Sequence, residues 1–403
     1  MRSPGLMRVG VCLGDFVPEA GGGYTFTSQV FDAFLRRAHT SSHHFVAFCH
    51  PTQARSLQSS SKGDNLEFIG IPPKGFVETG IAAVKHFSPL VAFLYRVPSR
   101  FERAARSRGV ELVWFVGGGV YDTPDIPYIG TVWDIQHRTH PWFPEVSSRG
   151  HWVYREVRHA TFLRRATYVI TGTKVGAEQL GAYYQVPQDR IRILPHPTPT
   201  LPTGNDAPSP RVVGAVGGKQ FLVYPAQFWP HKNHVNLVRA LHLLHTRHGM
   251  DVDLVLTGSD KGNLGRVKSV VDDLKLTARV HMLGFVTTED LVWLYRHATA
   301  LVYPSFSGPE NLPPLEACSV GCPVVLAEYP GAREQLGDAA MFCDPHDPEQ
   351  MAEAITHLRD HPDLRQNLMT NGYKRAASWT ADDYVKGVFA MLDEFETVRR
   401  CWA

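Results

Sequence analysis

Residues 303–325 read YPSFSGPENLPPLEACSVGCPVV and hold the most informative pattern in the chain. An apolar strand is predicted to end near Tyr303, and a second apolar strand is predicted over 323–326. Between them, Pro313 and Pro314 suit the first turn of a helix, where the missing N–H of a proline costs little. The stretch therefore predicts a strand, a loop, a helix and a strand in quick succession, which is typical of a parallel α/β sheet.

The start of this predicted helix is a candidate binding site for a diphosphate. Free backbone amides, such as those of Asn311, Leu312 and Leu315, would point out of the helix and favour an anion. Glu316 follows about one turn later, and its carboxylate could accept two hydrogen bonds from a ribose diol. An ordinary helix that is capped by Asn311 explains the same residues without any ligand.

The same alternation of strands and helices extends over the whole chain in two series. The first series runs from a strand at 9–13 to a strand at 190–194, and the second runs from 221–225 to 323–326. The stretch 195–219 between them holds six prolines and four glycines, which indicates a linker. Two such series predict an α/β protein with two Rossmann-like lobes that face each other across a cleft.

Composition excludes several classes of protein. Hydrophobic residues make up 43% of the 403 residues, which is enough for large cores, and the net charge of +2 does not favour nucleic acid as a partner. The six cysteines include no Cys-x-x-Cys pair, which fits a reducing, cytoplasmic compartment. His242, His245 and His248 recur every three residues, but a solvated helix face explains this spacing better than a metal site.

The stretch 303–325 resembles the signature of glycosyltransferase family 4, whose members are retaining enzymes of the GT-B fold. The family pattern is Glu-Gly-Phe-Gly-Leu-Pro-x-x-Glu-Ala. The matching residues in this chain are Leu312, Pro313, Glu316 and Ala317. Gly308 stands at the position of the first glutamate, and whether Glu310, two residues later, replaces that glutamate is open. The resemblance implies that Glu310, Asn311, Leu312 and Glu316 contact the sugar donor.

A second similar segment is YPAQFWPHKN, residues 224–233. The resemblance implies that Lys232 contacts the donor phosphates, where it would stabilise the charge of the departing diphosphate. Gln227 stands where the family often has an arginine, and His231 stands where some members have one. Without the resemblance, a surface lysine is the favoured explanation of Lys232.

A third similar segment is VHMLGFVTTEDLVWLY, residues 280–295, which resembles the part of the family that holds the nucleobase. The resemblance implies that Phe285 and Val286 frame the base, beside Gly284, which permits close backbone approach. Gly258 matches a family glycine near the donor. A strand that leads into a capped helix accounts for the same segment in structural terms.

Two segments of the N-terminal half resemble the family more weakly. The triplet Gly21-Gly22-Gly23 precedes a predicted helix, and the resemblance implies that Gly22 and Gly23 lie against the donor phosphates. The segment TVWDIQHRTHPWFPE, residues 131–145, resembles a family segment His-Asp-Leu-Gln-His. It implies that Asp134 and His137 are catalytic, together with Lys232, and contact the sugar or the acceptor. The alternatives are that the glycines form a mobile turn and that Asp134 and His137 make structural hydrogen bonds.

The resemblance implies a retaining, metal-independent transferase that needs no cofactor beyond its nucleoside-diphosphate sugar donor. The acceptor would be the hydroxyl of a sugar, a lipid-linked sugar or a small molecule, at the cytoplasm or the inner membrane face. An epimerase or phosphorylase of the same fold, or a non-catalytic sugar-nucleotide-binding protein, stays open. The implied parts are an acceptor-side domain over 1–198, a linker over 199–219, a nucleotide-sugar domain over 220–379, and a helix over 380–403 that crosses back to the first domain.

Overall fold

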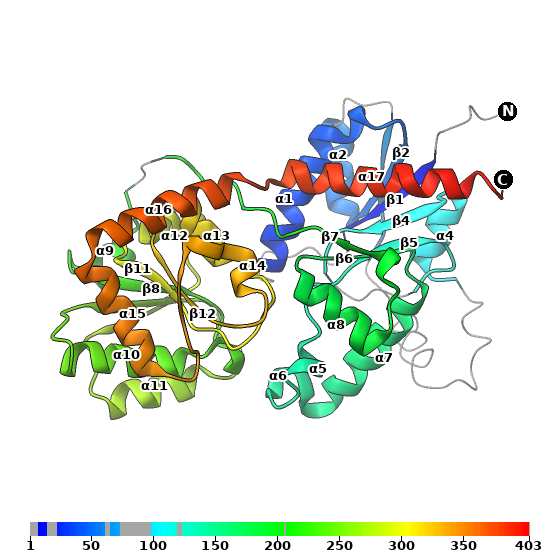
Figure 1. The fold of residues 1–403 in the computed structure, drawn as a ribbon. Helices are drawn as coiled ribbons and strands as arrows, with labels where there is room; N and C mark the ends of the chain where they lie inside the picture. Colours follow the sequence, from blue (N-terminus) through cyan, green and yellow to red (C-terminus); the bar gives the residue numbers. More distant parts are fainter. Residues whose placement is uncertain are drawn as a thin grey trace. The chain divides into compact units, whose positions relative to one another are not determined.

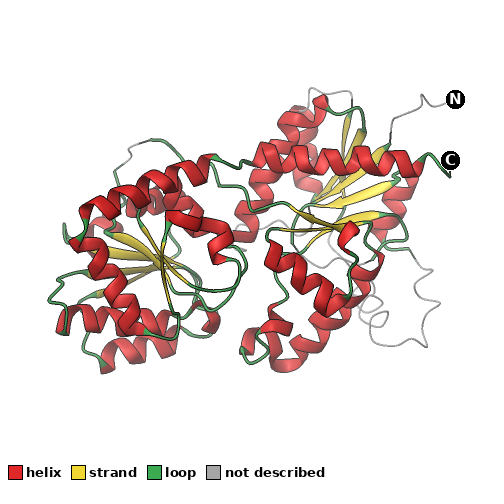
Figure 2. Ribbon diagram, viewed as in Figure 1, coloured by secondary structure: helices red, strands yellow, loops and turns green. Residues whose placement is uncertain are grey.

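The computed structural model describes residues 7–13, 22–60, 65–72, 98–118, 123–204 and 207–402. The chain divides into two compact units (Figure 1). The N-terminal unit comprises Met1–Thr139, Arg149–Pro197 and Ala381–Ala403, and the C-terminal unit comprises His140–Ser148 and Thr198–Thr380. Each unit is built around its own parallel sheet, with helices packed on both faces (Figure 2).

The sheet of the N-terminal unit has seven strands in the order β3-β2-β1-β4-β5-β6-β7. The strands are β1 (Arg8–Cys12), β2 (His44–Cys49), β3 (Leu66–Gly70), β4 (Leu112–Phe115), β5 (Tyr128–Thr131), β6 (Tyr168–Thr171) and β7 (Ile191–Ile193). The helices described are α1 (Gly22–Arg37), α2 (Pro51–Ser60), α4 (Arg100–Ser107), α5 (Gln136–Thr139), α7 (His151–Arg165), α8 (Lys174–Tyr184) and α17 (Ala381–Arg399). The order reverses beside β1, as in dinucleotide-binding folds.

The sheet of the C-terminal unit repeats this arrangement with six strands in the order β10-β9-β8-β11-β12-β13. The strands are β8 (Phe221–Pro225), β9 (Asp253–Thr257), β10 (Val280–Gly284), β11 (Ala300–Tyr303), β12 (Val324–Ala327) and β13 (Met341–Cys343). The helices are α6 (Pro144–Ser147), α9 (Pro210–Val216), α10 (His234–Thr246), α11 (Leu264–Asp273), α12 (Thr288–His297), α13 (Leu312–Ser319), α14 (Ala332–Leu336), α15 (Pro348–Asp360) and α16 (Pro362–Ala377). The order reverses between β8 and β11, which pair in parallel.

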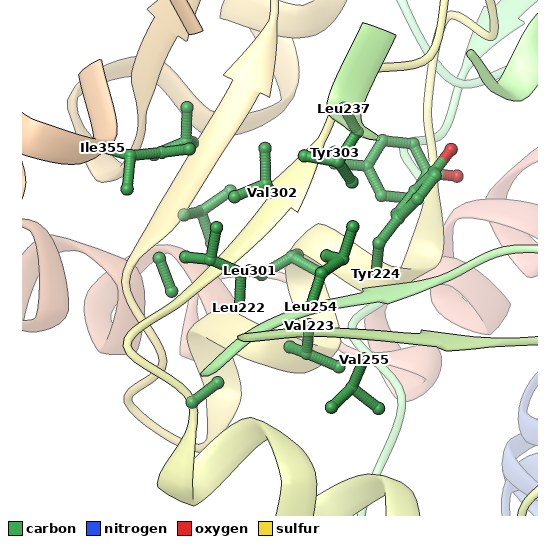
Figure 3. Close-up of a cluster of buried hydrophobic side chains, with 14 of the residues drawn as sticks. Leu222, Val223, Tyr224, Leu237, Leu254, Val255, Leu301, Val302, Tyr303 and Ile355 are labelled. Carbon is green, nitrogen blue, oxygen red and sulfur yellow. The ribbon is translucent and has the colours of Figure 1, made fainter. Parts of the chain in front are cut away.

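The core of the C-terminal unit explains why its strands read as continuous apolar runs. Strands β8, β9, β11 and β12 are buried on both faces, because helices cover the parallel sheet on each side. Figure 3 shows a cluster of these buried side chains, including Leu222, Leu254 and Leu301 from three neighbouring strands. Tyr224 and Tyr303 lie together at one edge of this cluster, with their ring centroids 5.2 Å apart.

The stretch that composition indicated as a linker is partly structured. Helix α9 lies within it, and its residues Val212 and Val216 are buried in the core of the C-terminal unit. Ser209 fixes the start of α9, because its backbone N–H and its hydroxyl donate to the two carboxylate oxygens of Asp290, each at 2.8 Å. Prolines and glycines therefore mark the ends of this helix and do not show that the whole stretch is a linker.

Helix α17 packs on the N-terminal unit, although it follows the C-terminal unit in the chain. Phe389 stacks on Phe45 of β2 with ring centroids 5.4 Å apart. Arg36 and Arg37, at the end of α1, each lie 3.0 Å from the carboxylate of Asp382. In the described part of the chain, no helix is both long enough and apolar enough to span a bilayer.

A buried carboxylate holds the amino ends of β9 and β10 together. Asp253 is 0% exposed, and its oxygens lie 3.3 Å from Lys219 Nζ, 3.0 Å from Arg279 and 2.8 Å from His281 Nε2. Burial raises the pKa of Asp253, but the hydrogen bonds from His281, Arg279 and Lys219 lower it overall. Its folded-state pKa therefore lies below its unfolded-state pKa, and its charge stabilises the fold above pH about 4.

We expect Asp253→Asn to lower the free energy of unfolding by about 1–3 kcal/mol at pH 7, because the three basic groups lose their buried counter-charge. The deficit should shrink as pH falls from about 5 to about 3, since protonation removes the same charge from the wild type. Urea unfolding at each pH measures it. Asp251→Asn is the control, because Asp251 also pairs with Arg279 but its side chain is 79% exposed. This variant should lower the free energy of unfolding by less than about 1 kcal/mol. A deficit that is equal at neutral and acidic pH contradicts the assignment.

Candidate functional site

The candidate site lies at the carboxyl ends of β8 and β11, where the strand order of the C-terminal sheet reverses. Ligands of doubly wound sheets bind outside the carboxyl ends of the strands at such a point. The loop after β8 contains the short turn Pro230–Lys232, and the loop after β11 leads into α13. These loops are the two segments that the sequence predicts to bind phosphate.

Lys232 is anchored at both its backbone and its ammonium group. Its Nζ donates to Tyr303 Oη and to Asn311 Oδ1, each at 3.0 Å. The same ammonium lies 5.3 Å from the centroid of the Tyr303 ring. Its carbonyl oxygen accepts from the Tyr224 hydroxyl at 2.7 Å. Lys232 is therefore not a solvated surface lysine, because residues at the ends of β8 and β11 hold it in place.

Asn311 connects three loops. Its Oδ1 accepts from Lys232 and, at 2.8 Å, from the Tyr303 hydroxyl. Its Nδ2 donates to the Tyr329 hydroxyl at 3.0 Å and to the Gly308 carbonyl at 3.3 Å. Asn311 occupies the N-cap position of α13, but its side chain makes no capping hydrogen bond. The interpretation of Asn311 as an ordinary helix cap is therefore wrong.

The backbone of Asn311 is paired with Gln335 of α14. The Asn311 N–H donates to Gln335 Oε1 at 3.1 Å, and Gln335 Nε2 donates to the Asn311 carbonyl at 2.7 Å. The prediction that the Asn311 amide is free to bind a diphosphate is therefore wrong, because Gln335 accepts its hydrogen. The roles predicted for the amides of Leu312 and Leu315 stay predictions, and the Leu312 side chain is buried.

Glu316 lies one turn inside α13 and is 7% exposed. The hydroxyl of Tyr295 in α12 donates to its Oε2 at 2.8 Å. Burial raises the pKa of Glu316, and the bond from Tyr295 opposes that shift only in part. Glu316 is thus a buried, partnered carboxyl group beneath the loop, and its contact with a ribose stays a prediction.

His231 and Gln227, which precede Lys232 in the same loop, also have fixed partners. The His231 N–H lies 3.1 Å from Glu145 Oε1, and the His231 Nδ1 lies 2.5 Å from the same oxygen. Burial raises the pKa of Glu145, but the bonds from His231 lower it overall. Gln227, at the expected arginine position, accepts from Trp229 Nε1 at 3.0 Å. No sequence motif pointed to Glu145.

Glycines bring the loops after β8 and β9 and the end of β10 close together. Gly258 has φ 122° and Gly284 has φ 60°, both in the region that favours glycine. The Gly258 N–H donates to the Gly284 carbonyl at 2.7 Å. A Cβ atom on Gly258 would lie 2.5 Å from the carbonyl oxygen of Ala226, next to Gln227. Gly258 is therefore required for this close packing, whether or not it contacts a donor.

The predicted base-binding residues lie at the end of β10. The Phe285 side chain is 73% exposed, whereas Val286 packs against the core. Thr287 caps α12, because its side chain accepts from the Asp290 N–H at 3.2 Å. An exposed aromatic ring is suited to stack on a nucleobase, and this role stays a prediction.

Glu310 lies half-buried between Gly308 and Asn311. Burial raises the pKa of the Tyr329 hydroxyl, and the negative charge of Glu310 raises it further. Gly308, at the position of the missing glutamate, has φ 116°, which a glutamate would adopt only with strain. The local backbone is thus built for glycine at this position, and whether Glu310 replaces the glutamate stays open.

The N-terminal unit holds the remaining predicted residues. Gly22 and Gly23 begin α1, and Gly21 lies outside the described residues. A Cβ atom on Gly23 would lie 3.2 Å from the ring of Trp133, so this glycine lets α1 approach the carboxyl end of β5. Asp134 Oδ1 accepts from the Gln136 N–H at 2.9 Å and lies 3.0 Å from Arg155. The predicted ligand contacts of the two glycines and of Asp134 stay predictions.

His137 is a buried structural residue. It is 0% exposed, and its Nε2 lies 2.9 Å from Tyr184 Oη and 3.3 Å from Glu156. Burial, together with the electrostatic interactions with His159 and Arg155, lowers the pKa of His137 to about 4. The packing of α7 and α8 leaves none of its surface accessible, and its predicted contact with the sugar or acceptor stays a prediction.

Two of the three histidines that could suggest a metal, His245 and His248, have other partners. His245 Nε2 lies 2.7 Å from the Val252 carbonyl, and His248 Nε2 lies 3.4 Å from a carboxylate oxygen of Glu349. Among the residues that the structure describes, no group of three or more His, Cys, Asp or Glu side chains has the geometry of a metal site.

Comparison with known sequences identifies a matching family and several relatives. Residues 207–375 match the family described as glycosyl transferases group 1. The D-inositol 3-phosphate glycosyltransferase of Acidothermus cellulolyticus is 29% identical over 257 residues, which cover 61% of this chain and 57% of the relative. The O-antigen chain mannosyltransferase B of Escherichia coli is 30% identical over 160 residues, which cover 40% of this chain and 42% of the relative. The chain spans about half the length of these curated relatives.

Solved structures share the fold over almost the whole chain. Sucrose-phosphate synthase from Thermosynechococcus elongatus has a TM-score of 0.66 at 17% identity and covers 98% of this chain and 100% of its own. Anabaena HepE in complex with UDP-glucose has a TM-score of 0.67 at 14% identity and covers 96% of this chain and 100% of its own. These identities show the fold alone. Together with the two sheets, they confirm the predicted GT-B class of two Rossmann-like lobes.

We expect Gly258→Ala to lower the free energy of unfolding by about 3 kcal/mol or more, because it combines an unfavourable φ with a contact to the Ala226 carbonyl. Gly262→Ala is the matched control: Gly262 has φ 99°, but a Cβ atom added there would have nothing within 4 Å. The Gly262→Ala variant should lower the free energy of unfolding by about 1 kcal/mol, from backbone strain alone. Thermal and urea unfolding measure both variants, and equal losses contradict the close-packing role of Gly258.

Proposed function

Because residues 207–375 match the family described as glycosyl transferases group 1, we propose that this chain is a retaining glycosyltransferase. It moves a sugar from a nucleoside-diphosphate sugar to the hydroxyl of a glycan, a lipid-linked sugar or a small molecule, in polysaccharide or glycoconjugate biosynthesis. The observation that carries the proposal is the position of Lys232, which Tyr303 and Asn311 hold where the strand order reverses. The proposed location is the cytoplasm or the inner membrane face.

The comparisons support the class of donor. The relatives named above are a glycosyltransferase and a mannosyltransferase, and the HepE structure contains UDP-glucose. The residues of this chain that match the family pattern lie in the C-terminal unit, at the carboxyl edge of its sheet. A nucleoside-diphosphate sugar is therefore the proposed donor, and its base and sugar are left to experiment.

The proposed chemistry depends on charge at the leaving group. Negative charge accumulates on the diphosphate as the bond to the anomeric carbon breaks, and a fixed cation beside it lowers the barrier. Lys232 supplies that cation, and its acceptors Tyr303 and Asn311 are neutral, so they do not cancel its charge. The start of α13 adds a positive helix end. We therefore assign leaving-group stabilisation to these groups, without a protein-bound metal.

The remaining donor contacts follow from the same edge of the sheet. The exposed ring of Phe285 would stack on the base, beside Val286. Tyr295 binds one carboxylate oxygen of Glu316, so a ribose diol would use the other oxygen. Retention would follow from attack on the same face as the leaving phosphate, which makes positioning the main task of the protein. Asp134 stays a candidate contact for the acceptor in the N-terminal unit.

A sugar-nucleotide-binding protein without catalysis is the second candidate. Gln227 and Gly308 stand where the family often has an arginine and a glutamate, and Gln227 is already bonded to Trp229. Both replacements remove charged groups from the site. This candidate predicts binding of a sugar nucleotide without turnover.

A screen of UDP-, GDP-, ADP- and dTDP-sugars tests the proposed function. We expect at least one sugar nucleotide to raise the melting temperature, because a ligand that binds only the folded state stabilises it by mass action. Proton NMR of the product formed with a panel of hydroxyl acceptors should then show the anomeric configuration of the donor. Inversion contradicts the retaining assignment, and binding without product for any acceptor supports the second candidate.

We expect Lys232→Ala to reduce the single-turnover rate by about 10²–10³, while it weakens donor affinity less, because the lysine acts mainly as charge develops. Single-turnover transfer and calorimetric titration with the donor measure the two effects. Lys261→Ala is the control, because Lys261 lies over the nearby Trp229 ring, 5.7 Å from its centroid, and has no assigned role. A Lys232→Ala variant that turns over at the wild-type rate removes Lys232 from the reaction.

A further inference from the structure

Glu145 caps the turn that carries Lys232. The turn Pro230–Lys232 begins after Trp229, whose side chain makes no capping hydrogen bond. Proline has no N–H, and the first N–H groups of a helical turn have no acceptor inside the turn. Glu145 Oε1 accepts the N–H of His231 at 3.1 Å and lies 2.5 Å from His231 Nδ1. A carboxylate that is 86 positions away in the chain therefore does for this turn what a capping residue does for its own helix.

The other side of the turn is held by the loop after β11. The Phe306 N–H donates to the His231 carbonyl at 2.9 Å. The carbonyl oxygen of the next residue, Lys232, accepts from the Tyr224 hydroxyl at 2.7 Å. The peptide groups before and after His231 are thus bonded to two different segments, to Glu145 on one side and to Phe306 on the other. These bonds fix the orientation of the turn from which the side chain of Lys232 extends.

Apolar contacts shield the bond between Glu145 and His231. Glu145 lies in the segment His140–Ser148, which belongs to the C-terminal unit. The Phe143 ring of this segment lies 5.8 Å from the Phe306 ring and 6.0 Å from the His231 ring, centroid to centroid. The side chain of Glu145 is only 6% exposed. A hydrogen bond that is shielded from water in this way is stronger than the same bond at the surface.

The carboxyl group of Glu145 is ionised in this setting. Burial raises the pKa of Glu145, but the hydrogen bonds from His231 lower it overall. An ionised carboxylate only accepts hydrogen bonds, so Nδ1 of His231 carries the hydrogen that lies between the two groups. Hydrogen bonds to a charged group are about twice as strong as neutral ones. Glu145 therefore holds both the backbone and the ring of His231 through strong bonds.

We propose that Glu145 is a positioning residue, which acts on the reaction by fixing the turn from which Lys232 reaches the leaving diphosphate. This inference rests on the proposed function, in which Lys232 stabilises the leaving group. The alternative is that Glu145 only attaches the segment His140–Ser148 to its unit and contributes to stability alone. The two roles differ in whether the effect of Glu145 on turnover requires Lys232.

A double-mutant cycle with Lys232 separates the two roles. Glu145→Ala should lower the single-turnover rate of sugar transfer by about tenfold to 10²-fold, because a small displacement of a group that acts on the reacting atoms can cost that much. In the Lys232→Ala background, the same change should lower the rate by less than about threefold, because the group that Glu145 positions is then absent. The donor is whichever UDP-, GDP-, ADP- or dTDP-sugar the wild type turns over. A Glu145→Ala effect that is equally large in both backgrounds would overturn the proposal.

Glu145→Gln is the conservative variant. It keeps the size of the side chain and one oxygen that can accept from the His231 N–H, but it loses the charge. It should therefore retain more activity than Glu145→Ala, with a rate about three- to tenfold below the wild type. If Glu145→Ala does not fold, the same cycle with Glu145→Gln decides the question, and a loss that is undiminished in the Lys232→Ala background overturns the proposal.

Asp253→Asn is the matched control for stability. Asp253 is also a buried carboxylate with basic partners in the same unit, but it lies at the amino ends of β9 and β10, away from the site. This variant should unfold at lower urea concentration, yet the rate of the folded protein should change by less than about twofold. A loss of turnover as large as that of Glu145→Ala would mean that the rate simply follows stability, which would overturn the proposal.

These outcomes separate the inference from the function on which it rests. If the wild type transfers sugar from none of these donors, the proposed function fails, and the inference fails with it. If Lys232→Ala turns over at the wild-type rate, the lysine has no role that Glu145 could support. If Lys232→Ala is slow and the effect of Glu145→Ala is the same with and without the lysine, only the role of Glu145 is overturned.

Discussion

The parallel pairing of β8 with β11 is the contact on which the candidate site depends. The registers Ala300 with Leu222 and Leu301 with Val223 bring the carboxyl ends of the two strands to the same edge of the sheet. Tyr224 and Tyr303 pack against each other there, and the loops that carry Lys232 and Asn311 begin directly after them. A shift of one residue in this register would turn Tyr303 to the opposite face and separate it from Lys232.

Except for β3 and β13, sequence reasoning predicted the strands, the order of the loops and most of the residues that meet at this edge. It succeeded because buried parallel strands read as apolar runs and because Pro313 and Pro314 mark the start of a helix. It did not find Tyr329, Gln335 or Glu145. Their contacts join segments that are separate in the sequence. Tertiary packing creates such contacts, and it leaves no local sequence pattern that would predict them.

The predictions that failed have the same origin, because tertiary packing decided against what the local sequence indicated. Prolines and glycines marked 195–219 as a linker, but Val212 and Val216 bury an apolar face against the C-terminal core, which composition cannot reveal. Local propensity favours Asn311 as an ordinary helix cap, which was the alternative without a ligand, but its side chain bonds to Lys232 and Tyr329 instead.

The division of the chain into units bears on how the protein folds during synthesis. The segment His140–Ser148 belongs to the C-terminal unit but precedes most of it, and α17 belongs to the N-terminal unit but follows all of the C-terminal one. During synthesis, Glu145 emerges before its partner His231 in the loop after β8. The aromatic residues of α1 and β2 that pack against Phe389 remain exposed until α17 has emerged. The N-terminal unit therefore cannot complete its contacts until α17 emerges, and this late, long-range closure slows folding and prolongs the exposure of apolar surface to aggregation.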